Sequence, residues 1–158
     1  MPNNPTDDAA ALNGSPRAFY EQYLTTLSET YSDGDTFPLA PFFSDNCTLI
    51  SWGMDAEARG RRAIIAHYEE AVQRMKQQVQ GLHRIEVQTD SYEDHVSEDG
   101  LSAWAAGCQT VLYRGRLEAR PAVVLFTHLL SRPATGAPWK FTRRHTSQAG
   151  HEAGRFVL

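Results

Sequence analysis

The chain is poor in cysteine and has none of the common signatures of cofactor or metal binding. Its only two cysteines, Cys47 and Cys108, are far apart, lack CxxC spacing and lie in apolar runs, so we interpret them as reduced core thiols rather than a disulfide or a nucleophile. No cluster of His, Cys, Asp or Glu has metal-ligand spacing, and no GxSxG, Walker-type or GxGxxG motif occurs. We therefore expect no metal and no cofactor.

An excess of basic residues is also absent. The formal net charge is −4 and the isoelectric point is about 5.8, so the overall electric field does not attract nucleic acid or an anionic membrane. No apolar run is long enough to span a bilayer, and residues 1–15 lack the basic and apolar regions of a secretory signal. We expect a cytoplasmic protein that binds neither nucleic acid nor membranes.

The chain does contain enough apolar residues to form one folded domain. Of its 158 residues, 41% are hydrophobic and 22% are charged, as in ordinary globular proteins, and a chain of this length buries a sizeable core without disulfides. We predict a flexible arm over residues 1–15, a folded domain over residues 16–148 and a loose tail over residues 149–158. No internal repeat or low-complexity segment is present.

Hydrophobic spacing predicts two helices and at least five strands. One helix follows Ser15 and Pro16, and a second runs from Arg61 to Gln80. Short β-branched or apolar runs separated by turn residues predict strands over residues 47–52, 82–96, 101–114, 120–132 and 139–148. Because the long strands follow one another across short turns, we expect an α+β domain with both helices on one face of a curved antiparallel sheet.

Three local patterns add a resemblance to a known family. FFSDNCTLISWG at residues 42–53 and RGRRAIIAHYEE at residues 59–70 resemble motifs of the nuclear transport factor 2-like superfamily, which includes ketosteroid isomerase and the SnoaL-like polyketide cyclases. Trp139, followed by His145 and Ser147, resembles the end of the calcium/calmodulin-dependent kinase II association domain. The resemblance implies a cone-shaped α+β barrel, with the helices on the concave face of the sheet. Enzymes and binding modules share this fold, so it does not define the chemistry.

The same resemblance suggests candidate site residues. It aligns Tyr23 and Tyr68 with tyrosines in the isomerase pocket, whereas Ser51 and Thr127 occupy the positions of the two isomerase carboxyl groups. A hydroxyl cannot perform the proton transfer of a carboxylate near neutral pH. A ketosteroid isomerase mechanism is therefore not expected, and Ser51 and Thr127 remain candidates for substrate binding, together with Trp52 at the cavity mouth.

On the last strand, the resemblance turns Thr142, Arg144 and Thr146 toward the cavity. It assigns Trp139, Arg143 and His145 to the convex face, where a partner sheet would cover them; this need for cover motivates the prediction of a homodimer. The apolar character of Trp139 would by itself have favoured the opposite assignment.

Each candidate has a functional and a purely structural interpretation. Arg144 either receives a carboxylate, enolate or phenolate oxygen, or it pairs with a carboxylate inside the protein or extends into solvent at the strand end. Tyr23 and Tyr68 either donate hydrogen bonds to a substrate oxygen or pack in the core, and Trp52 either lines the cavity mouth or only packs. His67 and His128 are either general bases or structural residues. For His128, a shift of one residue in strand register exchanges it with Thr127.

Two functions follow from these candidates. The first is a cofactor-independent enzyme that isomerises, cyclises, dehydrates or hydrolyses a small hydrophobic, oxygenated metabolite. The second is a non-catalytic module that binds a small ligand or forms oligomers, as the kinase association domain does. Both include a small-molecule ligand and a homodimer.

Overall fold

The computed structural model describes residues 14–52, 54–116 and 121–149. Most of the predicted arm and tail lies outside these residues. The elements in chain order are α2 (Pro16–Asp33), the 3-10 helix η1 (Phe37–Phe42), β1 (Phe43–Ile50), β2 (Ala58–Arg59), α3 (Arg61–Gln78), β3 (Arg84–Val96), β4 (Ser102–Arg114), β5 (Ala122–Ser131) and β6 (Lys140–Gln148).

Both predicted helices are present, and local sequence explains where they begin and end. The Ser15 hydroxyl accepts a hydrogen bond from the Ala18 amide at 3.1 Å, and Pro16 occupies the first turn of α2. The helix ends at Gly34, whose φ of 81° is left-handed. Helix α3 follows Gly60 and ends at Gln78, two residues before the predicted Gln80.

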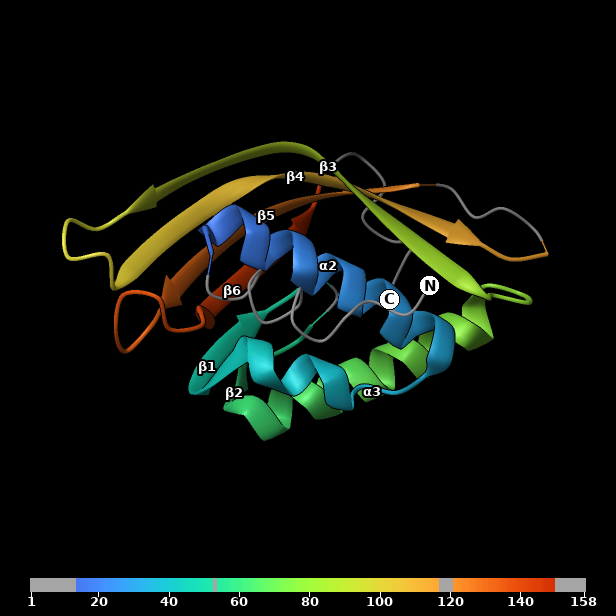
Figure 1. The fold of residues 1–158 in the computed structure, drawn as a ribbon. Helices are drawn as coiled ribbons and strands as arrows, with labels where there is room; N and C mark the ends of the chain where they lie inside the picture. Colours follow the sequence, from blue (N-terminus) through green and yellow to red (C-terminus); the bar gives the residue numbers. More distant parts are fainter. Residues whose placement is uncertain (1–13, 53, 117–120, 150–158) are drawn as a thin grey trace.

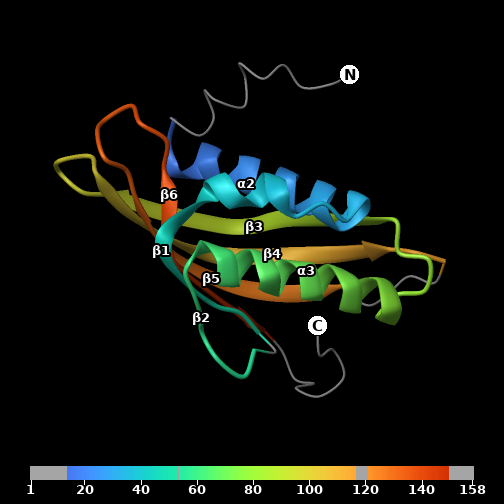
Figure 2. The same cartoon turned by 90° about the horizontal axis from the view of Figure 1, so that it is seen from below.

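The six strands form one curved, unclosed sheet in the order β2-β1-β6-β5-β4-β3. Figures 1 and 2 show α2 and α3 side by side on its concave side. All neighbouring strands are antiparallel except β1 and β6, which are parallel. The predicted α+β class and helix placement are confirmed, while the parallel pair and the two-residue strand β2 are additions to the prediction.

Close contact between β3 and β4 occurs where the sheet bends. The strand register shifts between Thr89 and Ser91, which marks a β-bulge on β3. Opposite the bulge lies Gly107, where a Cβ atom would overlap the Ser91 carbonyl oxygen and would lie 2.7 Å from the Phe126 ring. Glycine therefore permits the close backbone approach at this bend.

A second bulge, on β6, corrects the predicted faces of that strand. The register shifts between Leu129, which pairs with Arg143, and Leu130, which pairs with Phe141. Thr142 is the extra residue, so Phe141 and Arg144 both turn their side chains inward. The predicted inward position is right for Arg144 and Thr146 and wrong for Thr142, which is only partly buried and donates to the Leu129 carbonyl oxygen at 3.1 Å.

Trp139 also differs from its predicted environment. Its side chain is 1% exposed, and its indole Nε1 donates to the Gly14 carbonyl oxygen at 2.9 Å. The Arg132 guanidinium carbon lies 4.2 Å from the ring centre. Since residues of the same chain cover Trp139, this tryptophan does not require a partner sheet. Arg143 and His145 are exposed, as predicted.

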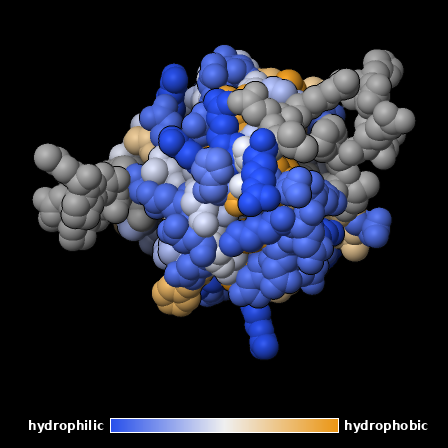
Figure 3. Space-filling view, turned by 90° about the vertical axis from the view of Figure 1, so that its right-hand side faces the viewer, coloured by the Kyte–Doolittle hydropathy of each residue, from blue (hydrophilic) through white to orange (hydrophobic). Residues whose placement is uncertain are grey.

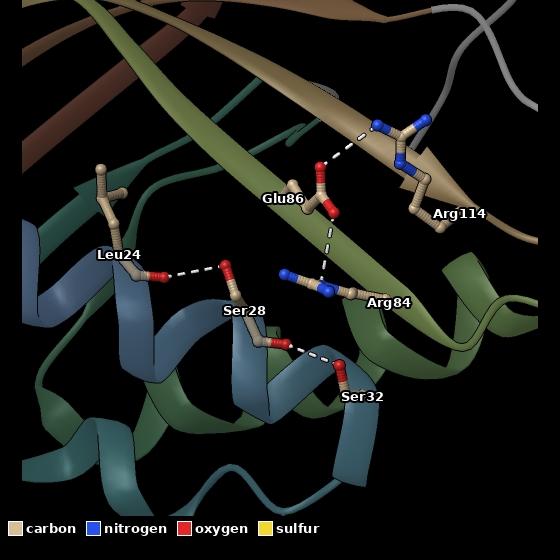
Figure 4. A network of polar contacts seen from close by, with 6 residues as sticks. All are labelled: Leu24, Ser28, Ser32, Arg84, Glu86 and Arg114. Atoms are coloured by element: carbon tan, nitrogen blue, oxygen red, sulfur yellow. Dashed lines mark hydrogen bonds and ion pairs between the residues drawn. The ribbon is translucent and has the colours of Figure 1, made fainter. Parts of the chain in front are cut away.

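The surface at the end of the molecule where α2 and α3 finish is mainly hydrophilic, as Figure 3 shows. In Figure 4, Glu86 of β3 pairs with Arg84 at 3.4 Å and with Arg114 of β4 at 3.2 Å. Nearby on α2, Ser28 and Ser32 donate to carbonyl oxygens of their own helix. Since Ile85 and Val87 beside Glu86 line the interior cavity, β3 separates a charged edge from an apolar interior.

Among the residues that the structure describes, no helix combines the length and the apolar character needed to cross a membrane. The cytoplasmic location stays a prediction.

Candidate functional site

A cavity of about 80 Å³ lies between the helices and the concave face of the sheet. Most of its wall is apolar and includes Leu27, Met75, Ile85, Val111 and Val124. Polar or aromatic side chains reach it from the two residues that follow β1 and from α3, β4 and β6. They include Ser51, Trp52, His67, Tyr68, Gln109, Arg144 and Thr146. An apolar cavity with a few convergent polar groups is typical of a small-molecule site.

Arg144 is the most unusual group in this cavity, because it is a buried cation without a carboxylate partner. Its side chain is 4% exposed, and no Asp or Glu of the described residues forms an ion pair with it. Nη1 donates to the Tyr68 hydroxyl at 3.2 Å, and Nε has no hydrogen-bond partner among the described residues. Burying a charge without an opposite charge is costly, so the guanidinium is suited to receive an anionic oxygen.

Two tyrosines extend the hydrogen bonding from Arg144. The hydroxyls of Tyr23 and Tyr68 are 2.6 Å apart, and the Arg144 guanidinium carbon lies 4.9 Å from the centre of the Tyr23 ring. Burial raises the pKa of Tyr23 well above its usual 10, although the charge of Arg144 acts in the opposite direction. If Tyr23 donates to Tyr68, the Tyr68 oxygen accepts from both neighbours and its own proton can be donated into the cavity.

His67 lines the cavity on α3 and is partly buried. Its ring lines the cavity beside Tyr68, with ring centres 5.7 Å apart. Burial lowers the pKa of His67 below its usual 6.5, and the charges of Arg74 and Arg144 lower it further. The imidazole is therefore neutral near pH 7, which is the form that a general base requires.

Ser51, Trp52 and Thr146 form another part of the wall. The Thr146 hydroxyl donates to the Ser51 hydroxyl at 3.0 Å, which joins the inner face of β6 to the end of β1. Trp52 lies beside them and is partly buried. These three residues line the cavity together. Their substrate-binding role stays a prediction.

Comparison with known proteins identifies the architecture. No protein-family model and no curated protein matches the sequence, but many solved structures match its fold. A nuclear transport factor 2-like protein with a cystatin-like fold from Novosphingobium aromaticivorans has a TM-score of 0.63 and 17% identity over 97% of this chain and 95% of its own. The chain has the nuclear transport factor 2-like fold.

Two further structures agree with this result. A ketosteroid isomerase-like protein from Erwinia carotovora atroseptica has a TM-score of 0.59 and 19% identity over 91% of this chain and 98% of its own. A Xanthomonas campestris protein named as a calcium/calmodulin-dependent protein kinase II association domain has a TM-score of 0.65 and 13% identity over 88% of this chain and 91% of its own. At such identities the likeness concerns the fold alone.

Within the nuclear transport factor 2-like fold, Thr127 was predicted to face the cavity, but β5 places it on the opposite, convex face of the sheet. Thr127 is exposed, whereas its neighbour His128 is 1% exposed. Because side chains of a strand alternate between faces, Thr127 shares the convex face with Leu125 and Leu129. Thr127 therefore does not line the cavity, and its predicted inward position is wrong.

His128 faces inward but packs among aromatic rings instead of lining the cavity. Its ring is stacked on Phe126 with centres 4.7 Å apart, and it lies 5.0 Å from Tyr20 and 4.9 Å from Phe141. Neither ring nitrogen has a hydrogen-bond partner among the described residues. Burial lowers the pKa of His128 well below 6.5, and the charge of Arg144, the cross-strand neighbour, lowers it further.

One buried polar pair was missed by the sequence-based candidates. The Tyr20 hydroxyl on α2 donates to Oε1 of Gln109 on β4, and both side chains are buried. Gln109 shares the inward face of β4 with Gly107, Val111 and Tyr113, so strict alternation along this strand could have identified it. A lone glutamine on an inward face is the signal that was available.

The described residues contain no group of three or more His, Cys, Asp or Glu side chains arranged to hold a metal ion. The predictions that no metal and no cofactor are needed remain predictions.

The buried neutral state of His128 predicts how stability depends on pH. Below pH 6.5 an unfolded histidine binds a proton that folded His128 does not, so the free energy of unfolding should fall by up to about 1.4 kcal/mol per pH unit for this residue. His67 acts in the same direction. Urea unfolding between pH 7.5 and 5 should show a smaller slope for His128→Phe than for the wild type. The exposed His95→Gln serves as the control, and an unchanged slope in His128→Phe would contradict the assignment.

Proposed function

We propose that this protein is a cofactor-independent enzyme that binds a small, largely apolar molecule through an oxygen that carries or acquires negative charge. The observation that carries the proposal is Arg144, a buried guanidinium with no carboxylate partner among the described residues. An anionic oxygen would satisfy the unpaired charge and the free Nε–H together. The cavity of about 80 Å³ is well below the roughly 300–1,000 Å³ of drug-sized sites, which favours a compact substrate.

The cavity groups suit removal of a proton next to a carbonyl group. His67 would take the proton as the C–H bond breaks, and the electron pair would form an enolate whose oxygen is held by Arg144 and Tyr68. Return of the proton to another carbon completes an isomerisation. In a dehydration, a hydroxyl on the neighbouring carbon would leave with that proton as water. Cyclisation or hydrolysis would use the same contacts to the oxyanion. Ser51, Trp52 and Thr146 would contact the rest of the molecule.

A non-catalytic ligand-binding module is the second candidate. It is favoured because neither of the two isomerase carboxyl positions carries a carboxyl group here. Ser51 offers only a hydroxyl, and Thr127 faces away from the cavity. Such a module would hold a small acid at Arg144 without converting it. Binding and turnover must therefore be measured separately.

For binding, Arg144→Gln should weaken the affinity for benzoate and other small carboxylates at least about tenfold, because a charge-assisted hydrogen bond is lost. Isothermal titration would measure this, and Arg143→Gln, which removes an exposed charge one residue away, should bind as the wild type does.

For turnover, NMR in deuterium oxide would follow hydrogen–deuterium exchange at the carbon next to the carbonyl in a panel of small ketones and acids. His67→Gln should slow exchange by about 10²–10⁴ while binding is kept. Binding without any exchange would favour the non-catalytic module instead.

We also infer a homodimer, on different grounds from those in the sequence. The convex face of the sheet carries an apolar patch, which we define as Trp104, Val123, Leu125 and Leu129; their side chains are 37–46% exposed. Trp104 pairs across the strands with Leu129, and the β5 members alternate with buried residues. Contiguous exposed apolar residues of this kind mark interaction surfaces.

Sedimentation velocity at micromolar concentration should show a dimer. A charge at the centre of the convex apolar patch, as in Leu125→Arg, should produce monomers, because a buried unpaired guanidinium opposes association. Phe37→Arg is the matched control, since Phe37 is 79% exposed on η1, and it should stay dimeric. A monomeric wild type would refute the dimer.

A further inference from the structure

We propose that Gln109 is a second recognition point in the cavity and that its amide N–H groups select ligands carrying a second oxygen acceptor besides the one held at Arg144. The inference rests on the proposed function, because it concerns the ligand of the same site. It narrows the ligand class from small molecules with one anionic oxygen to those with two oxygen functions, such as an oxo acid or an alkoxy acid.

The position of Gln109 requires an explanation. Its side chain is 4% exposed on the inward face of β4, next to Val111 on the same face and opposite Val124 of β5. Both of these neighbours line the cavity with it. A primary amide in apolar surroundings is unfavourable unless its hydrogen bonds are made. An apolar residue would complete this part of the wall at lower cost if packing were its only role.

The hydrogen bond from Tyr20 orients the amide. The Tyr20 hydroxyl donates to Oε1. The Tyr20 ring packs in a cluster with Phe126 and Tyr92, with ring centres 4.7 Å and 5.7 Å away. Burial raises the pKa of Tyr20 above its usual value, so the hydroxyl keeps the proton that it donates. With Oε1 occupied by a donor, the amide group is fixed with its nitrogen directed away from Tyr20.

The nitrogen of Gln109 is consequently the end left for a ligand. A primary amide nitrogen carries two N–H donors and no acceptor. No hydrogen bond from Nε2 to another described residue accompanies the bond at Oε1. The partner it lacks must be an acceptor, so a carbonyl, ether or hydroxyl oxygen of a ligand fits, and an apolar ligand atom leaves a buried donor unpaired.

Such a donor makes the site selective. A site built to hydrogen-bond a polar group rejects an analogue that lacks it, because the protein group is then buried without a partner. Arg144 would hold the first oxygen and Gln109 the second, and the two side chains approach the cavity from different strands, β6 and β4. Two fixed points would also orient the ligand relative to His67, whereas a single contact would leave the ligand free to rotate.

The test compares benzoate with 3-acetylbenzoate and 4-acetylbenzoate by isothermal titration on the full chain. The wild type should bind at least one acetyl isomer about tenfold more tightly than benzoate. Gln109→Leu should keep benzoate binding and lose the preference, and Gln109→Met, of similar length and also without a donor, gives the same readout if the leucine variant does not fold. Tyr20→Phe, which frees the amide to turn, should reduce the preference without abolishing benzoate binding. A purely structural role would alter stability but not this affinity ratio.

Three results would overturn the inference. Equal wild-type affinity for benzoate and both isomers would do so, and so would a preference that survives in both Gln109 variants. In either case, benzoate binding that still depends on Arg144 would leave the proposed function standing. Failure of every carboxylate to bind the wild type would remove this inference together with the anionic-oxygen site on which it rests.

Discussion

The buried charge of Arg144 is the constraint around which the interior of this protein is organised. No carboxylate of the described residues neutralises it, and its contacts instead include the Tyr68 hydroxyl and the face of the Tyr23 ring. Its field reaches the other titratable groups of the interior. Burial has the largest effect on the pKa of His67 and His128, and the charge of Arg144 lowers both further, so these rings stay uncharged. For Cys47, burial raises the thiol pKa to about 12 although Arg144 acts in the opposite direction. Among the described residues, Arg144 is therefore a buried permanent cation in contact with neutral groups.

Sheet curvature is what brings that cation to the cavity. The bulge at Thr142 changes the alternation of β6 so that Arg144 and Thr146 follow Phe141 on the concave face. The bulge before Ser91, with Gly107 opposite, allows β3 and β4 to approach closely where the sheet bends over α2. The helices then cover the concave face and exclude water from the guanidinium, which strengthens any interaction it makes with an anion.

The sequence was sufficient to place the two long helices and the five longer strands along the chain, because capping residues and periodicity are local signals. Ser15 and Pro16 mark the start of α2, and turn residues separate the long strands. The family resemblance correctly turned Arg144 inward. Register on β5 was not predictable in the same way, because Leu125 and Leu129 on one face are as apolar as Phe126 and Leu130 on the other. The bulge at Thr142 depends on pairing with β5, which is a tertiary interaction. The inward position of Gln109 follows from alternation along β4, but its hydrogen bond to Tyr20 is again a tertiary interaction.

The central claim is that Arg144 remains buried at a cost to stability because it serves a ligand. Replacing an uncompensated buried charge with an apolar side chain of similar length should relieve that cost. The most direct measurement is the free energy of unfolding in denaturant, without any ligand, for the wild type, Arg144→Met and the exposed control Arg143→Met. The claim predicts that Arg144→Met is more stable than the wild type by about 1 kcal/mol or more, while the control is unchanged. A loss of stability in Arg144→Met would contradict it and would make Arg144 a structural residue of the core.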